Sequence, residues 1–148
     1  MKRMTGASFV LIVAILTLTP NALAQKAKCA QSTITKLEDD SDRARSWQEL
    51  YRFYQKYRAC DVDDATVEEG YSESVARILV DSWETLPGGA RLMRRDPHFR
   101  DFVFEGINVT LNLEDIENIA KKSSEACPKS LKSLCLRLNQ ATQEARKG

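Results

Sequence analysis

The segment Ser46–Cys60 reads SWQELYRFYQKYRAC and determines the fold class that we predict for this chain. Large apolar residues recur there at steps of three and four, which places an aromatic stripe along one side of a helix. The stripe consists of Trp47, Leu50, Tyr51, Tyr54 and Tyr57. Ser46 and Glu49 have the spacing of a capping box and predict the helix start, with Ser41 as an alternative one turn earlier. We interpret the stripe as hydrophobic core; the alternative is an exposed tyrosine-rich contact surface.

The same helical period continues downstream of this segment. Apolar residues from Val67 to Leu86 step by three or four and predict one helix over about residues 64–84. The sequence LPGG, at residues 86–89, contains turn-forming residues and is expected to end that helix.

Asp96 and Pro97 predict another helix start, because a capping carboxylate precedes a proline whose missing N–H costs nothing in the first turn. Residues 107–113 alternate like a strand but have no partner strand, so we interpret them as a connection. Two further helices are predicted over about residues 113–126 and 130–147. The fold class expected is therefore all-α, as a single compact domain of five or six helices without an internal repeat.

The first 24 residues have the layout of a secretory signal peptide. A basic tip precedes an apolar run, Ala7–Leu18, and small residues lead to a cleavage site expected between Ala24 and Gln25. The run is shorter than the roughly 18 residues of a membrane-spanning helix, so an uncleaved anchor is the lesser alternative. The basic tip and the Ala24–Gln25 junction are typical of bacterial export. We therefore expect residues 25–148 to form a helical domain that is located in the periplasm or outside the cell.

The charge of the exported part is almost balanced. Cleavage would subtract two of the 22 basic residues and none of the 21 acidic residues, which leaves a net charge near −1. A chain without a basic excess has no long-range attraction for nucleic acid or an anionic membrane. Neither partner is therefore expected, nor is membrane insertion after signal cleavage.

Four cysteines, all beyond the signal segment, indicate two disulfides in an exported chain. Four cysteines allow three pairings; the one that we favour joins Cys29 to Cys60 and Cys127 to Cys135. Each of these pairs brackets a predicted helical hairpin. A zinc site is not expected, because no CxxC spacing occurs and His98 is the single histidine.

The segment Cys60–Val75, CDVDDATVEEGYSESV, contains six carboxylates. An EF-hand loop that began at Asp61 would need Asp or Asn, then Gly, and finally Glu at its fifth, sixth and twelfth positions. Those positions hold Ala65, Thr66 and Ser72, so no calcium site is predicted. Most of this acidity, including that of Asp63 and Asp64, is explained by the start of a helix, where carboxylates interact favourably with unpaired N–H groups.

The sequence indicates no catalytic constellation and no cofactor. Glu68 and Glu69 lie on one predicted helix, whereas acid and base catalysis by carboxylates needs two groups facing each other across a cleft. His98 lacks a Gly-x-Ser-x-Gly or reactive-cysteine context, and no phosphate-binding or dinucleotide fingerprint is present. We therefore predict that the protein is not an enzyme.

Two charged clusters are the candidate partner-binding residues. They are the acidic group Glu68, Glu69 and Glu73 around Gly70, and the basic group Arg91, Arg94 and Arg95. A glycine within a helix costs roughly 1 kcal/mol relative to alanine, so Gly70 indicates either a helix break or a close approach of another backbone or a partner. The clusters are interpreted as solvated surface, an internal ion-pair network, or self-complementary surfaces of a homodimer.

Three motifs carry a resemblance. W-x-E-L-Y-x-F-Y-x-K-Y-x-x-C-D at Trp47–Asp61, E-G-Y-S-E-S-V at Glu69–Val75 and the C-P at residues 127–128 resemble small exported helical proteins of Gram-negative bacteria. That group includes the periplasmic immunity proteins that neutralise cell-wall amidases delivered by type VI secretion. The resemblance implies a disulfide-containing all-α fold, often dimeric, that blocks the cleft of an enzyme by surface complementarity.

We therefore predict a non-enzymatic periplasmic protein-binding protein, such as an immunity or inhibitor protein that neutralises a cell-wall-degrading toxin. One alternative is a ligand-binding module in which the aromatic helix lines a pocket for a small apolar molecule. The other is a cell-wall hydrolase that uses Glu68 or Glu69 as its acid.

Overall fold

The computed structural model describes residues 27–28, 30–61 and 65–148. In chain order its elements are β1 (Ala27–Lys28), α1 (Gln31–Arg43), α2 (Trp47–Tyr57), β2 (Cys60–Asp61), α3 (Ala65–Asp81), the 3-10 helix η1 (Trp83–Thr85), α4 (Leu86–Arg95), α5 (Pro97–Glu105), α6 (Leu113–Glu125), the 3-10 helix η2 (Lys129–Leu131) and α7 (Lys132–Ala145). The predicted all-α class is confirmed, although the seven α-helices of these residues exceed the five or six expected. The predicted signal peptide, Cys29, Asp63 and Asp64 lie outside the described residues.

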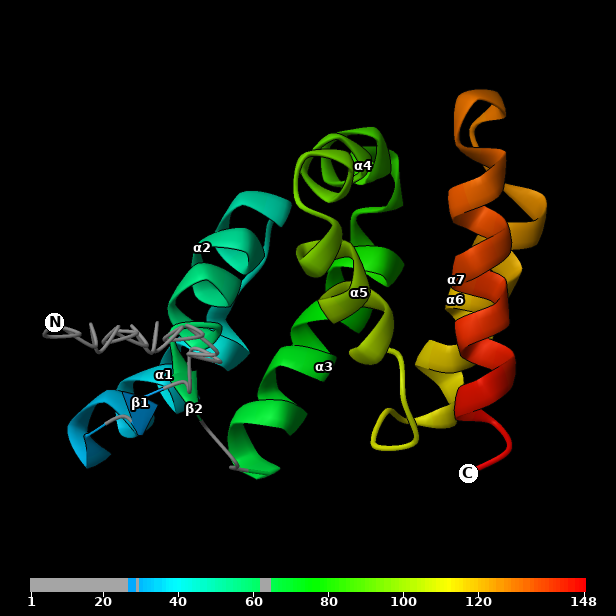
Figure 1. Cartoon of the computed structure of the whole chain (residues 1–148). Helices are drawn as coiled ribbons and strands as arrows, with labels where there is room; N and C mark the ends of the chain where they lie inside the picture. Colours follow the sequence, from blue (N-terminus) through cyan, green and yellow to red (C-terminus); the bar gives the residue numbers. More distant parts are fainter. Residues whose placement is uncertain (1–26, 29, 62–64) are drawn as a thin grey trace, which may run out of the picture.

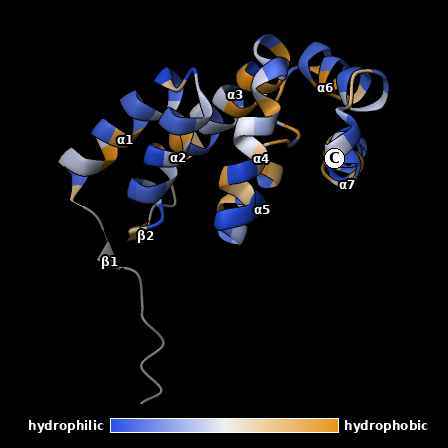
Figure 2. Cartoon of the chain, turned by 90° about the horizontal axis from the view of Figure 1, so that it is seen from above, coloured by the Kyte–Doolittle hydropathy of each residue, from blue (hydrophilic) through white to orange (hydrophobic). Residues whose placement is uncertain are grey.

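The helices form three successive layers (Figure 1). The first layer contains α1 and α2, the second α3, α4 and α5, and the third α6 and α7. The layers keep this order when seen from above in Figure 2. Helix α3 contacts α1 of the first layer and α6 of the third, so it is the central helix of the domain. The two short strands add one parallel pairing, with Ala27 opposite Cys60.

The aromatic stripe of α2 lies in the core, which confirms the core interpretation. The ring of Tyr54 lies 5.3 Å from that of Phe99 and 5.2 Å from that of Phe102, both on α5. Phe53, which the predicted stripe omits, is also buried and lies 6.4 Å from the ring of Tyr71 on α3. Tilted ring pairs of this kind stabilise a fold by about 0.5 to 1.5 kcal/mol each beyond the apolar area that they bury. Aromatic contacts therefore join the first layer to the second.

Helix α2 begins at the predicted cap. The Ser46 hydroxyl oxygen accepts a hydrogen bond from the Glu49 N–H at 3.3 Å. In return, Glu49 Oε2 accepts from the N–H of Arg45 at 2.9 Å, one residue earlier than in the usual capping box. The hydrogen bond from the Arg45 backbone is the main reason that the pKa of Glu49 lies below its ordinary value, since it stabilises the carboxylate.

Gly70 lies inside α3, where it allows α1 to approach closely. A Cβ at position 70 would overlap the Ser41 hydroxyl oxygen and lie 3.1 Å from the Ser41 Cβ. One turn further along α3, the buried Ser74 hydroxyl donates to the carbonyl oxygen of Ser41. Helix α3 continues without a break past this position, so the close approach of another backbone explains the glycine.

The prediction that LPGG ends a helix is wrong. Helix α3 already ends at Asp81, and the LPGG residues 86–89 form the first turn of α4, with proline in a position that needs no N–H. Gly89 lies against the indole of Trp47, where a Cβ would come within 2.5 Å of two ring atoms. The indole N–H of Trp47 also donates to the Thr85 hydroxyl at 3.0 Å. Close packing against Trp47 therefore outweighs the poor helix propensity of glycine.

The start of α5 and the connection after it match the predictions. Asp96 Oδ1 accepts a hydrogen bond from the N–H of His98 at 3.1 Å, which caps α5. Residues 107–112 form turns and bends and no strand. Asn112 then caps α6, because its Oδ1 accepts from the N–H of Asp115 at 2.8 Å.

Polar contacts fix the third layer internally and against the second. The amide Nδ2 of Asn139 of α7 lies within hydrogen-bonding distance, 3.0 to 3.3 Å, of three oxygen atoms of α6, among which its two N–H groups are shared. The indole N–H of Trp83 donates to the carbonyl oxygen of Ala126, just after the end of α6, at 2.9 Å. Trp83 thus links the end of α3 to the end of α6.

The disulfide between Cys127 and Cys135 is confirmed and joins the end of α6 to the first turn of α7. Cys60 is also disulfide-bonded. Because Cys29 lies outside the described residues, the pairing of Cys29 with Cys60 stays a prediction.

Candidate functional site

The acidic candidate residues lie on α3. The side chains of Glu68, Glu69 and Glu73 are exposed. Glu73 also pairs with Arg77, at 3.9 Å, and Arg77 lies 3.1 Å from a carboxylate of α1. Gly70 is buried beneath α1, so it shapes this face without lying on it.

The basic candidate residues Arg91, Arg94 and Arg95 are exposed on α4. Among the ion pairs of the described residues, none joins these arginines to Glu68 or Glu69. The two clusters therefore form no internal ion-pair network with each other. Arg94 lines a groove that faces α7, whereas Arg91 and Arg95 are not among the residues that line this groove.

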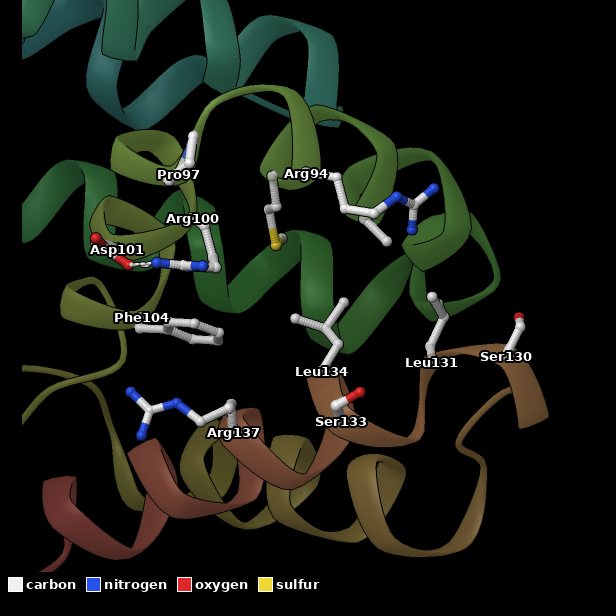
Figure 3. Close-up of a pocket in the computed structure, with 12 residues that line it drawn as sticks. Arg94, Pro97, Arg100, Asp101, Phe104, Ser130, Leu131, Ser133, Leu134 and Arg137 are labelled. Atoms are coloured by element: carbon white, nitrogen blue, oxygen red, sulfur yellow. Dashed lines mark hydrogen bonds and ion pairs between the residues drawn. The ribbon is translucent and has the colours of Figure 1, made fainter.

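This groove, of about 670 Å³, lies between α4 and α5 on one side and the N-terminal half of α7 on the other (Figure 3). Its apolar surface comes from both walls and consists of Ala90, Met93, Pro97, Phe104, Leu131 and Leu134. The polar side chains along it are those of Arg94, Arg100, Asp101, Ser130, Ser133 and Arg137. The groove therefore combines an apolar floor with a rim that carries three arginines and one aspartate.

The three arginines differ in their partners. Arg100 donates from Nε and Nη2 to Asp101 Oδ1 at 2.9 and 2.8 Å. The guanidinium of Arg137 lies 5.3 Å from the centre of the Phe104 ring, and its Nη1 donates to a side-chain amide at 3.2 Å. Arg94 has no hydrogen bond or ion pair with another side chain in the part of the chain that the structure describes. Two of the three positive charges thus face the groove without a carboxylate partner.

A second hollow, of about 560 Å³, continues the groove along the C-terminal half of α7. It shares Asp101, Phe104 and Arg137 with the first hollow, while Glu105 and Glu144 add negative charge. Its margin includes Val109, a large apolar side chain that is 58% exposed. The continuous groove is therefore basic near α4 and acidic near the C-terminal end of α7.

The groove is lined by apolar, charged, hydroxyl and amide side chains. No histidine or cysteine is among the residues that line its two hollows. His98 is exposed in the first turn of α5 and lies beside a different hollow with Tyr54 and Arg58. Over residues 27–28, 30–61 and 65–148, no three or more His, Cys, Asp or Glu side chains come together in a way that would hold a metal ion.

Titration behaviour in the core is set by burial. Loss of hydration raises the pKa of the Tyr71 and Tyr54 hydroxyls above the ordinary tyrosine value, so both stay protonated at neutral pH. In the described residues, every buried side-chain nitrogen or oxygen has a hydrogen-bond partner. The same residues include no helix with the length and apolarity needed to cross a bilayer.

Comparison with known proteins adds no relative. The chain matches no family model, and no curated protein or solved structure is significantly similar to it.

Of the residues that line the first hollow, the sequence predicts Arg94 as a partner-binding residue and none of the others. Leu134 is half-buried and lies at the groove, and Arg137 follows three residues later on the same side of α7 (Figure 3). A leucine and an arginine at this spacing signal an amphipathic face. The facing residue Phe104 comes from another helix, and no local pattern reveals that the two walls meet.

Proposed function

We propose that this protein is a non-enzymatic, exported protein-binding protein that acts as an inhibitor or immunity protein against a cell-wall-degrading toxin. The observation that carries the proposal is the open groove of about 670 Å³ between α5 and α7, with apolar side chains from both walls and three arginines on its rim. Such a surface suits recognition of a protein, because apolar contacts supply affinity and charges at the rim select the partner.

The exposed carboxylates Glu68, Glu69 and Glu73 form a second proposed contact surface on α3. They lie on one face of one helix, which is unsuited to acid and base catalysis across a cleft. Their negative charge would instead steer a basic region of the partner during association.

Export and disulfide bonding support the same proposal. The layout of residues 1–24 predicts secretion, and the disulfide between Cys127 and Cys135 suits an oxidising compartment such as the periplasm. We propose that Cys29 pairs with Cys60 as a second disulfide. Non-reducing peptide mapping tests this pairing, and a peptide that links Cys29 to Cys127 would contradict it.

A pull-down tests the proposed function. Immobilised mature chain, residues 25–148, is expected to retain a specific protein from an envelope extract and to inhibit its release of peptidoglycan fragments. The variant Arg94→Glu and a triple variant with lysine at positions 68, 69 and 73 should each weaken retention. Arg146→Glu is the matched control, since Arg146 is exposed and lies outside both hollows. Failure to retain any protein, or to inhibit the one retained, would contradict the proposal.

A small apolar ligand is the second candidate, because the groove volume falls within the range of about 300 to 1,000 Å³ typical of small-molecule sites. The aromatic helix α2 packs into the core, so the groove between α5 and α7 would be the site for such a ligand. Displacement of a hydrophobic dye by extracted lipids, without retention of any protein, would favour this candidate. Cleavage of peptidoglycan by the purified chain would instead favour a hydrolase.

A further inference from the structure

The groove between α5 and α7 has the length of a helix. Its two hollows follow η2 and α7 from Ser130 to Ala145 and meet at Arg137. Helix α7 has 14 residues, which correspond to about 21 Å at the α-helical rise. A partner segment that lies along the whole groove would therefore be a helix of about four turns.

The walls of the groove favour an amphipathic partner. Phe104 and Leu134 face each other from α5 and α7, each half-buried (Figure 3). Met93 of α4 also lines this hollow. Polar and charged side chains lie along the edges. An amphipathic helix matches this arrangement, because its apolar residues form one stripe and its charged residues flank that stripe.

The charges in the half of the groove next to α4 favour carboxylates on the partner, whereas Glu105 and Glu144 of the second hollow favour basic residues at the other end of the partner helix. Arg94 and Arg137 lack carboxylate partners, and Asp101, the acidic residue of the first hollow, already pairs with Arg100. Helix α7 begins beside the same end of the groove, and the N-terminus of a helix adds positive potential there. A carboxylate on the partner could form bidentate hydrogen bonds with a free guanidinium.

We propose that this groove binds an amphipathic helix of the partner protein, with its apolar stripe on Phe104 and Leu134 and with carboxylates on Arg94 and Arg137 in the half that lies next to α4. The inference rests on the proposed function and identifies the surface through which the partner is bound. The glutamates of α3 would then be a separate contact.

A designed peptide tests this inference. The probe is a fluorescein-labelled helical peptide of about 14 residues, with leucine at i, i+3, i+4 and i+7, glutamate on both flanks of one half and neutral polar residues on the flanks of the other half. One control peptide carries lysine in place of each glutamate, and another has the same composition in an order that destroys the apolar stripe. Fluorescence anisotropy with the mature chain should show saturable binding of the probe and at least about tenfold weaker binding of both controls.

Protein variants locate the binding site. Arg94→Glu should weaken binding of the probe by about tenfold or more, and Arg137→Glu should do the same if circular dichroism shows that it remains folded. Arg146→Glu makes the same change of charge outside both hollows and should leave the affinity unchanged within about threefold. Equal binding of the three peptides, or equal affinity of Arg94→Glu and the parent chain, would overturn the inference.

Two further outcomes separate this inference from the proposed function. If the pull-down retains an inhibited enzyme but the probe does not bind, the groove inference fails while the proposed function stands. Anilinonaphthalene sulfonate, a small anionic amphiphile, gives the second outcome. If it binds to the parent chain but not to Arg94→Glu, and if the probe does not displace it, the groove is a site for small molecules. That result would also overturn the proposal of a helical partner.

Discussion

Replacing Gly70 by alanine tests the closest approach between α1 and α3. The new methyl carbon would overlap the Ser41 hydroxyl oxygen and lie 3.1 Å from the Ser41 Cβ. Ser41 is only 1% exposed, and its carbonyl oxygen accepts a hydrogen bond from Ser74, so it has little room to move. We therefore expect Gly70→Ala to destabilise the fold, although alanine is the better helix former.

Two opposing effects determine how much Gly70→Ala changes the unfolding free energy. Alanine gains about 1 kcal/mol of helix propensity over glycine, whereas overpacking a buried contact costs about 1 to 3 kcal/mol. The expected net loss is about 1 kcal/mol of unfolding free energy. In a Ser41→Ala background the hydroxyl oxygen is absent, so the same Gly70→Ala change should be neutral or stabilising. The two substitutions should then be coupled by about 1 kcal/mol or more.

Urea unfolding of the parent, both single variants and the double variant, followed by far-ultraviolet circular dichroism, measures this coupling. The pull-down partner should still bind folded Gly70→Ala, because Gly70 is buried beneath α1. Additivity of the two substitutions within about 0.3 to 0.5 kcal/mol would refute the close approach as the reason for the glycine.

Three other substitutions test separate parts of the fold. Gly89→Ala should lower the unfolding free energy by about 1 to 2 kcal/mol, since the overlap of its methyl group with the Trp47 indole outweighs the gain in helix propensity; an unchanged urea midpoint would contradict that contact. Replacing both cysteines of the disulfide between α6 and α7 by serine should cost about 2.5 kcal/mol, as measured by the same unfolding assay under oxidising conditions. Glu49→Gln should destabilise the protein at neutral pH. Because folding lowers the pKa of Glu49, that difference should disappear as the pH falls below 4.5 and the carboxylate becomes protonated; a pH-independent difference in melting temperature would contradict the cap.

Much of the fold follows from short-range patterns. The stripe on α2, the Asp96 cap of α5 and the pairing of Cys127 with Cys135 were predictable, because each depends on residues within a few turns of one another. The predicted stripe does not include Phe53, because it follows only one side of α2. Helix α2 contacts both α3 and α5, so a wider face of the helix is buried.

The errors arise where distant residues meet. The glycines of α4 are typical of a turn when only their neighbours in the sequence are considered. Their role depends on Trp47, a residue of a different layer whose indole occupies the space where a Cβ at position 89 would lie. The groove could not be predicted for the same reason, since Phe104 and Arg137 belong to different layers. Of the candidate partner-binding residues, the structure places Arg94 at this groove and the glutamates on a separate exposed face.

The two tryptophans of the chain occupy different junctions between layers. Trp47 is held by Thr85 where the first layer meets the second, and Trp83 is held by Ala126 where the second meets the third. Both indoles are buried, at 2% and 7% exposure, so their emission depends on the packing around them. Each junction therefore carries its own intrinsic fluorophore, and single-tryptophan variants would report whether the layers separate together or one after the other, without any added label.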